Sequence, residues 1–524
     1  MLSGLGNRSL AEPRDRQKGI FVMARKSGLL AAVAMSVLLG SCSTTPAGSS
    51  AFTPFMSTKQ ERSIGQSEHP KLLAEYGGAY KDDRVAGYVA QVGGRVLQNS
   101  ETPNEQFTFT LLDSSVVNAF ALPGGYVYIS RQLLALMNDE AELASVLGHE
   151  VGHVTDRHTA KRYNTQMLGG LGSILVAVLT GSGQMAQLAG QAAQAYTLSY
   201  SRDQEFRADT LGVRYISRAG YDPYAASDML ATLGAQDALE AKIAGRQATD
   251  ATPGWARTHP LTGDRVNRAQ SLAQKTGAEL AGPQPRNRDA FLAAIDGLVV
   301  DDSAEQGFVR GRTFAHPQLK LTFTVPEGFT LQNSSRAVTA VGPGQTQVMF
   351  AGGPLSQGQG LESYIQQVWQ ALTEGQAGNM PRAQFRTING MQTATATTRL
   401  TTNNSVLDVS IVAYQWSPTQ AYHFVMVSPA YASSQAGAQA ASQAVRSLQS
   451  MLQSFRKLSD TEAARYKERR IKVVTVAKGQ TAQQLAERMA YDDHKLDRFL
   501  VLNGFTSPNE VKPGEKVKLI VYGS

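Results

Sequence analysis

The stretch that decides the fold is Leu147-Gly-His-Glu-Val-Gly-His-Val154, which carries the pattern HExxH at His149, Glu150 and His153. Residues four apart lie on one face of a helix, so both imidazoles can reach one ion, and neutral imidazole suits zinc. Glu150 lies about 100° round the helix from His149, where its carboxylate can take a proton from a zinc-bound water. The alternative is a surface helix with two histidines. The apolar flanks instead predict a buried helix, whose polar groups need a partner.

A third protein ligand is expected downstream, with a fourth position left open for water. The stretch Ser201-Arg-Asp-Gln-Glu-Phe-Arg-Ala-Asp209 places Glu205 and Asp209 four residues apart, again on one helix face. One carboxylate can bind zinc while the other holds a ligand histidine through its second ring nitrogen. By spacing alone, an exposed acidic pair balanced by Arg202 and Arg207 is the better explanation of the same residues.

Three motifs occur in order: Asn118-Ala-Phe-Ala-Leu-Pro-Gly-Gly-Tyr-Val-Tyr-Ile-Ser130, the helix with HExxH, and the stretch that ends at Asp209. Over residues 58–275 they resemble the CAAX-prenyl-protease/HtpX-like family of zinc metalloendopeptidases, and more narrowly its bacterial periplasmic lipoprotein branch. The resemblance implies a mainly α, gluzincin-type domain that holds one Zn²⁺, with Glu205 as third ligand and Asp209 as support for a ligand histidine. It also implies that an edge strand receives the substrate peptide as one more strand. The residues of this strand are Asn118, Ala119, Phe120 and Ala121.

Two further histidines are candidates for the site. His259 lies in Thr258-His-Pro-Leu-Thr-Gly-Asp-Arg265, which resembles the family's THP…R segment near the cleft. It can stabilise the oxyanion of the tetrahedral intermediate or approach the zinc as a resting-state ligand, and a plain loop histidine is an equal alternative. His158, five residues after His153, falls off the ligand face, so we expect it to be structural or exposed.

The N-terminal part predicts an export signal. Met23-Ala-Arg-Lys is a basic start, residues 28–39 are apolar, and Leu39-Gly-Ser-Cys42 resembles a bacterial lipobox. We therefore expect Met23 to be the true start, residues 1–41 to be a signal region, and Cys42 to carry a lipid that anchors the chain in a membrane. Ser43 after the cysteine favours the periplasmic face of the outer membrane of a Gram-negative bacterium. An ordinary cleaved signal with a coincidental cysteine is the alternative.

The chain of 524 residues is too long for one core and predicts a multidomain protein. Its net charge of +7 is mild and no basic stripe carries aromatic residues, so we expect no nucleic-acid partner. A Ser/Thr/Pro-rich tether over 42–59 is followed by a mainly helical peptidase domain over 60–280, with strands at 108–113 and 126–129. Its apolar run at 168–181 is short for a membrane span and is expected to be a core or cleft-flanking helix. Residues 281–305 are expected to form a linker.

Two accessory regions follow. Residues 306–457 alternate in five stretches (319–326, 346–350, 393–400, 407–414 and 423–427) and carry helical patterns at 361–372 and 438–455, which predicts an α+β sheet domain. It resembles the PsbP-like fold, which implies recognition or assembly. Residues 468–524 resemble a βααβ LysM module, which implies binding to N-acetylglucosamine polymers such as peptidoglycan. The usual GDTL reads Gly479-Gln-Thr-Ala482 here, so a purely structural module is the alternative.

These features together predict a zinc metalloendopeptidase anchored in the bacterial envelope. The family resemblance implies that its substrates are misfolded or stalled envelope polypeptides. The alternative from another class is an envelope assembly factor or chaperone whose proteolysis is latent or secondary. A wall-binding structural lipoprotein is a third reading, but it leaves the HExxH motif without a role.

Overall fold

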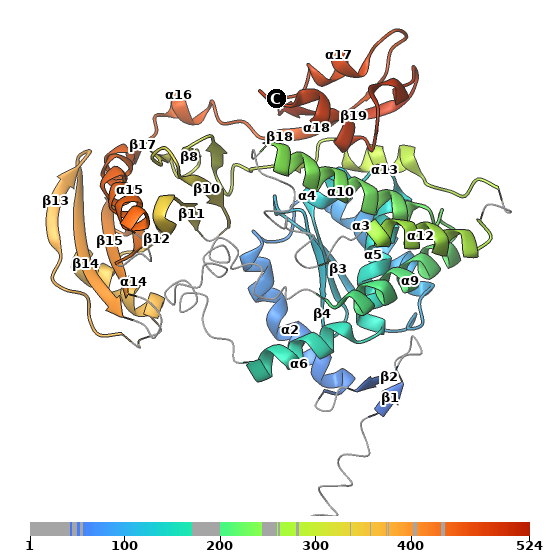
Figure 1. The fold of residues 1–524 in the computed structure, drawn as a ribbon, viewed down its shortest axis with the longest axis horizontal. Helices are drawn as coiled ribbons and strands as arrows, with labels where there is room; N and C mark the ends of the chain where they lie inside the picture. Colours follow the sequence, from blue (N-terminus) through green and yellow to red (C-terminus); the bar gives the residue numbers. More distant parts are fainter. Residues whose placement is uncertain are drawn as a thin grey trace, which may run out of the picture.

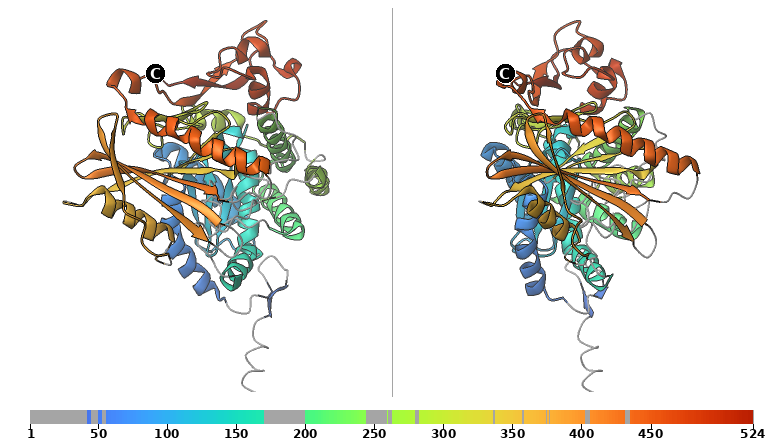
Figure 2. Two further views of the ribbon diagram at one scale, coloured as in Figure 1. Left: turned by 60° about the vertical axis from the view of Figure 1, so that its left-hand side comes forward. Right: turned by 90° about the vertical axis from the view of Figure 1, so that its left-hand side faces the viewer.

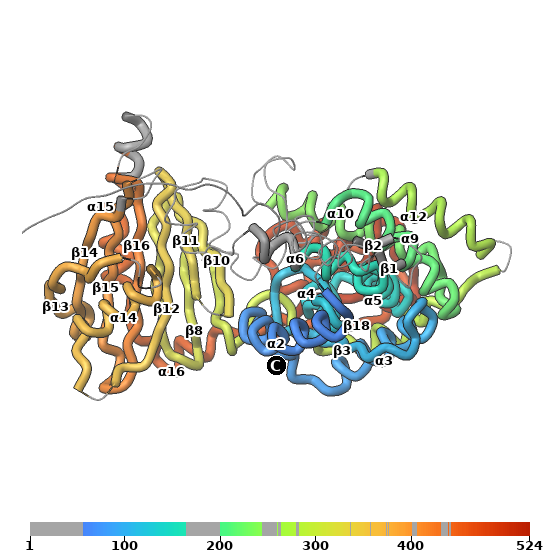
Figure 3. Tube along the Cα trace, turned by 90° about the horizontal axis from the view of Figure 1, so that it is seen from below, coloured from blue at the N-terminus to red at the C-terminus, as the bar shows by residue number. Residues whose placement is uncertain are grey.

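The computed structural model describes residues 42–44, 50–52, 56–169, 200–243, 259, 263–278 and 282–523, apart from gaps at 336, 357, 374, 376, 402–405 and 431–434. The signal region and most of the apolar run at 168–181 lie outside these residues. Within the described ranges, no helix combines the length and apolar character that a membrane span requires. Figures 1 and 3 show a mainly helical lobe, with the C-terminal segment against it, beside a separate lobe of β-sheet.

The helical lobe surrounds a small mixed sheet. The sheet has the order β3-β5-β4, formed by Thr108–Leu112, Tyr126–Ser130 and Ala119–Leu122. β3 and β5 are parallel, and β4 is antiparallel to β5. The described helices are α2 (Thr58–Glu75), α3 (Asp83–Gln98), α4 (Arg131–Leu136), α5 (Glu140–Thr155), α6 (His158–Gly169), α9 (Arg202–Arg218), α10 (Ala225–Ile243), α12 (Gly263–Lys275) and α13 (Arg288–Ile295).

Helix α5 is the buried helix that the HExxH motif predicts. Asp139 caps its start by accepting a hydrogen bond from the backbone N–H of Glu142, and all of its 16 residues are buried. Glycines on α5 face α9: a Cβ on Gly148 would lie 3.3 Å from Gly212 Cα, and one on Gly152 would lie 3.2 Å from the carbonyl oxygen of Ala208. The absence of side chains there lets the two helices approach closely, which brings the carboxylates of α9 within reach of the histidines of α5.

The second lobe contains the expected α+β sheet domain. A seven-stranded antiparallel sheet has the order β10-β11-β12-β16-β15-β14-β13. Helix α14 (Leu361–Thr373) packs on one face through Trp369 and Ile365, and α15 (Gln435–Ser454) covers the other face through Leu448 and Met451 (Figure 2). The strands are Thr330–Asn333, Val338–Val341, Gln347–Pro354, Gln420–Pro429, Val406–Ser417, Met391–Thr401 and Gln384–Ile388 in sheet order. A smaller sheet, β17-β9-β8-β7 (Arg456–Lys457, Leu321–Thr324, Thr313–His316 and Phe308–Arg310), lies beside it.

The C-terminal segment has the predicted order of strand, helix, helix and strand. These elements are β18 (Arg469–Thr475), α17 (Ala482–Ala486), α18 (Lys495–Leu502) and β19 (Lys516–Tyr522). A third strand comes from far upstream: β6 (Val299–Val300), just after α13, pairs with β18 so that Val300 lies opposite Arg469. The sheet lobe is therefore an insertion between two strands that are neighbours in space.

Two short strands lie within the expected tether over 42–59. β1 (Cys42–Thr44) pairs antiparallel with β2 (Ser50–Phe52).

Candidate metal centre

Four buried side chains converge between α5 and α9. His149, His153, Glu205 and His259 each offer one ligand atom, and these atoms lie within 4.8 Å of one another. His149 Nε2 is 3.0 Å from His153 Nε2, which in turn is 3.4 Å from Glu205 Oε1. His149 Nε2 is 3.6 Å from Glu205 Oε2. The structure thus brings together the three ligands expected from the sequence.

These distances suit a small divalent cation. Ligand atoms placed about 2.0–2.1 Å from a tetrahedral zinc are separated from each other by about 3.3 Å. Two imidazole nitrogens and a carboxylate oxygen are also the donor set that zinc prefers. Both carboxylate oxygens of Glu150 are buried without a hydrogen-bond partner among the described residues, which is unusual for a buried polar group unless the site binds a further group. The residues present therefore fit a zinc ion.

Asp209 has the supporting position that the resemblance implied. Its Oδ1 lies 2.9 Å from His149 Nδ1, so that Nε2 of the same ring faces the cluster. The guanidinium of Arg265 donates to both oxygens of Asp209, at 2.8 and 2.7 Å, and its Nη1 lies 2.8 Å from Glu205 Oε2. Burial by itself would raise the pKa of Asp209, but Arg265 and His149 outweigh it and lower that pKa. Burial would also raise the pKa of Glu205, but its contacts with His259, His153 and Arg265 outweigh it and lower that pKa, so both carboxylates stay ionised. Metal binding requires an ionised ligand carboxylate.

Glu150 lies beside the cluster, where the HExxH spacing placed it. Its side chain is fully buried, and burial raises its pKa to about 7. A carboxylate whose pKa is near neutrality is matched to accepting and returning a proton at physiological pH. Glu150 Oε1 lies 3.5 Å from His259 Nε2.

His259 belongs to the cluster in this structure. Its ring is fully buried, and its Nδ1 lies 2.9 Å from Glu205 Oε1 and 3.2 Å from His149 Nε2. The same ring thus contacts two expected ligands through one nitrogen and approaches the expected base through the other. This arrangement is not that of a plain loop residue. It is compatible with His259 as a resting-state ligand and with His259 as an oxyanion donor.

The expected substrate strand is β4, which follows Asn118. It pairs with β5 and stands last in the order of its sheet, so it is an edge strand among the described residues. It packs on α5 and α6, and its four side chains are all buried. Binding of a peptide along it stays a prediction.

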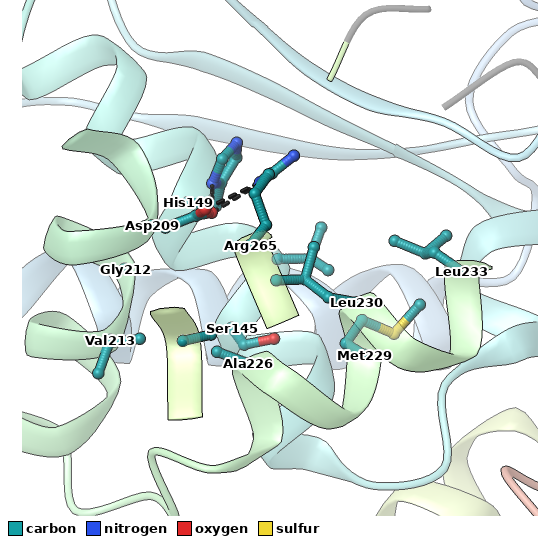
Figure 4. A pocket seen from close by; sticks show the side chains of 12 residues that line it. Ser145, His149, Asp209, Gly212, Val213, Ala226, Met229, Leu230, Leu233 and Arg265 are labelled. Atoms are coloured by element: carbon teal, nitrogen blue, oxygen red, sulfur yellow. Dashed lines mark hydrogen bonds and ion pairs between the residues drawn. The ribbon is translucent and has the colours of Figure 1, made fainter. Parts of the chain in front are cut away.

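A small cavity lies behind His149, on the side of Asp209 and Arg265 (Figure 4). Its volume is about 30 Å³, and apolar side chains of α10 such as Met229, Leu230 and Leu233 line it. This space is too small for a peptide, so it is not a cleft for substrate.

Three residues of the site were not assigned to it from the sequence. Arg265 appeared only as the end of a motif. Tyr200 stacks on His153, with ring centroids 3.7 Å apart and planes 13° apart. His158, expected to be structural or exposed, is buried with its Nδ1 3.0 Å from His153 Nδ1, so it is structural and not exposed. No local pattern could have shown these contacts, because they depend on how separate elements pack.

Helix α5 with HExxH and helix α9 with a facing carboxylate define a metallopeptidase domain with one metal centre. Residues 83–273 match peptidase family M48, a family of zinc metallopeptidases to which this part of the chain is similar. The chain is 31% identical over 229 residues to a beta-barrel assembly-enhancing protease of Yersinia pestis, which covers 42% of this chain and 45% of the relative.

Two more relatives support the same assignment. The beta-barrel assembly-enhancing protease of Escherichia coli is 29% identical over 266 residues, which cover 48% of this chain and 53% of that protein. The mitochondrial metalloendopeptidase OMA1 of Schizosaccharomyces pombe is 27% identical over 215 residues, which cover 40% of this chain and 60% of that protein. This chain thus spans about half the length of the curated relatives it matches.

Proposed function

We propose that this chain is a zinc-dependent endopeptidase that acts on polypeptides of the bacterial envelope. The observation that carries the proposal is the buried carboxylate of Glu150, whose pKa is about 7, beside a cluster of potential ligands formed by His149, His153 and Glu205. A zinc ion held there would polarise the scissile carbonyl and a water molecule. Glu150 takes a proton from the water and returns it to the leaving amine.

The other residues of the site hold the ligands in place. Asp209 orients His149, and Arg265 holds Asp209 and Glu205 together through a buried guanidinium. Burial excludes solvent from these groups, which strengthens each of the charge interactions. β4 supplies an edge along which an extended polypeptide can add main-chain hydrogen bonds. This mode of binding would favour unfolded or stalled chains over folded ones.

Replacement of the base tests the chemistry. Glu150→Gln in the full chain should keep one zinc per chain and lower peptide hydrolysis by about a hundredfold to ten-thousandfold, the usual contribution of a general base. Glu68→Gln is the matched control, since it changes a buried glutamate of α2 that is paired with Lys71 outside the cluster. Near-normal hydrolysis by Glu150→Gln would refute the mechanism.

Metal analysis should distinguish the roles of the two carboxylates of α9. Glu205→Ala should lose most of its zinc, whereas Asp209→Ala should weaken zinc affinity by about tenfold to a hundredfold. If Glu205→Ala kept full zinc and activity, Glu205 would not be a ligand.

We propose that His259 is a latch that occupies the position needed by the catalytic water. His259→Ala should then raise the basal cleavage of an unfolded protein, because a site with four protein ligands has no open position. If the residue is instead an oxyanion donor, its loss should lower turnover by about a hundredfold. An unchanged rate would contradict both roles.

We further propose that the chain is anchored through lipidated Cys42 at the periplasmic face of the outer membrane and that its C-terminal segment contacts peptidoglycan. The names of two relatives connect them with assembly of β-barrel proteins, which is consistent with an envelope substrate. Cys42→Ser should abolish lipid labelling and release the chain from membranes. The alternative, an assembly factor with secondary proteolysis, predicts that the Glu150→Gln chain still supports envelope assembly in a strain that lacks the wild-type protein.

A further inference from the structure

The second ring nitrogen of His153 faces another histidine. His153 is completely buried, and its Nδ1 lies 3.0 Å from Nδ1 of His158. On the far side of that ring, His158 Nε2 lies 3.1 Å from Asp156 Oδ2. All three residues are at most 3% exposed, so solvent does not compete for these contacts. His153 is therefore linked to a carboxylate through one intervening imidazole.

A break in the helix creates this arrangement. In a continuous α-helix, residues five apart point about 140° away from each other, which would aim His158 away from His153. Here α5 ends at Thr155, and Arg157 has a positive φ of 56° before α6 begins at His158. The guanidinium of Arg157 donates to Glu61 and to the carbonyl oxygen of Met56, and these bonds hold the reversal in place. The left-handed residue thus turns His158 back towards the ligand.

The hydrogen-bond order of the three groups follows from their chemistry. A histidine that binds a cation through Nε2 must carry its proton on Nδ1. His153 Nδ1–H can then donate only if His158 Nδ1 accepts, and this places the proton of His158 on Nε2. Asp156 Oδ2 is the acceptor that faces this second N–H. One tautomer of each ring satisfies all of the contacts.

We propose that His158, backed by Asp156, is the positioning residue that fixes the tautomer and ring orientation of His153 for metal binding. The inference rests on the proposed zinc site. The two ligand histidines are then supported in different ways: Asp209 contacts His149 directly, whereas Asp156 acts on His153 through His158. Tyr200 completes the restraint, since it stacks on the face of His153 while His158 contacts the edge of the same ring.

Zinc affinity of the full chain, measured by competition with a chelator, tests the proposal. His158→Leu should weaken affinity by about tenfold to a hundredfold, as loss of a partner behind a metal ligand usually does. His158→Asn should recover most of the affinity, because its Oδ1 takes the place of Nδ1 as an acceptor. Asp156→Ala should cause a smaller loss than His158→Leu. In the Co²⁺-loaded protein, visible absorption should change in His158→Leu and return towards the wild-type spectrum in His158→Asn.

Histidine 423 offers a matched control. His423 is buried in the sheet lobe and contacts Tyr364 Oη at 2.9 Å, so His423→Leu changes stability without affecting the metal. Wild-type affinity in a folded His158→Leu chain would overturn the inference, and so would an Asn variant as weak as the Leu variant. If His158→Leu does not fold, a folded Asp156→Ala chain with wild-type affinity and cobalt spectrum would overturn it instead. The zinc content of the wild-type chain tests the proposed site separately, because the inference concerns only the ratio of variant to wild type.

Discussion

The two regions that follow the peptidase domain along the chain relate to it in opposite ways. The C-terminal segment shares one hydrophobic core with the helical lobe, which joins Leu485, Phe499 and Leu519 to residues of α4, α5 and α13. The sheet lobe instead has its own cores, one on each face of its large sheet. Distance along the sequence is thus a poor guide here, since the farthest segment is the one built into the peptidase domain.

A buried lysine marks the junction. Lys518 on β19 is completely buried, and its Nζ donates to the carbonyl oxygens of Ala135 at 2.8 Å and Met137 at 2.5 Å. These carbonyls end α4, just before Asp139 caps α5. The C-terminal segment therefore supports the start of the helix that carries His149 and His153.

The sheet lobe contacts the helical lobe through polar groups that are exposed or only partly buried. These contacts include an ion pair between Lys81 and Glu305, whose side chains are 77% and 46% exposed. Ser335 also donates through Oγ to the carbonyl oxygen of Glu75. An exposed ion pair such as the one between Lys81 and Glu305 contributes about 0–1 kcal/mol. The difference between the two regions can be tested by removing or perturbing each one.

Truncation after residue 467 should have the largest effect. It would expose the apolar residues of α4, α10 and α13 that pack on the C-terminal segment. Each fully buried apolar side chain contributes about 1.5–3 kcal/mol, and a domain is stable by only about 5–15 kcal/mol. We expect an insoluble or unfolded peptidase domain by circular dichroism. A soluble truncated chain with full zinc content would show that the core is not shared in solution.

Replacement of the buried lysine should have the next largest effect. Lys518→Met keeps most of the side-chain volume but leaves two buried carbonyls without their donor, which should cost about 2–4 kcal/mol. Chemical denaturation measures this loss. The control is Lys516→Met on the same strand, because Lys516 is 42% exposed and paired with Asp289, which is 77% exposed. Equal effects of the two variants would contradict the role of Lys518 at the junction.

Acid should destabilise the sheet lobe through His423. Burial lowers the pKa of His423 to about 4, whereas a histidine in an unfolded chain titrates near pH 6.5. Between these values the unfolded lobe binds a proton that the folded lobe does not, so the free energy of unfolding falls as the pH falls. The loss should reach about 3 kcal/mol by pH 4.

Tryptophan fluorescence can follow this transition, since Trp369 and Trp416 both lie in the sheet lobe. His423→Gln should reduce the pH dependence of the free energy of unfolding of the sheet lobe between pH 6.5 and 4. If this variant kept the full pH dependence of the free energy of unfolding, another group would be responsible for the acid sensitivity.

Excision of the sheet lobe should have the smallest effect. Val300 and Arg469 are neighbours in the β6–β18 pairing, so a short Gly/Ser linker can replace residues 303–466 without moving either strand. Hydrolysis of an unstructured peptide should change by less than about fivefold, which corresponds to about 1 kcal/mol. Zinc content and the melting temperature of the helical lobe should stay close to those of the intact chain. A large loss of zinc or a large fall in the melting temperature would mean that the helical lobe depends on the sheet lobe as strongly as on the C-terminal segment.

Local periodicity explains which parts of the molecule were predictable. The spacing of four in HExxH and between Glu205 and Asp209 is enough to place each pair on one helix face, and the structure brings both pairs to one centre. Alternating residues likewise predicted strands that the structure contains, such as β15 and β16. These features could be predicted because they depend only on the geometry of a single helix or strand.

The sequence by itself determined the helix that carries HExxH and strands such as β15 and β16, and the family resemblance supplied the third expected ligand. Only the tertiary structure decided that a left-handed Arg157 turns His158 onto His153, that Arg265 joins two carboxylates, and that Lys518 supports the helix of the metal centre. Each of these contacts joins separate elements, in the last case residues more than 380 positions apart. Their formation depends on turn geometry and on how whole elements pack, and no periodic pattern along the chain encodes either.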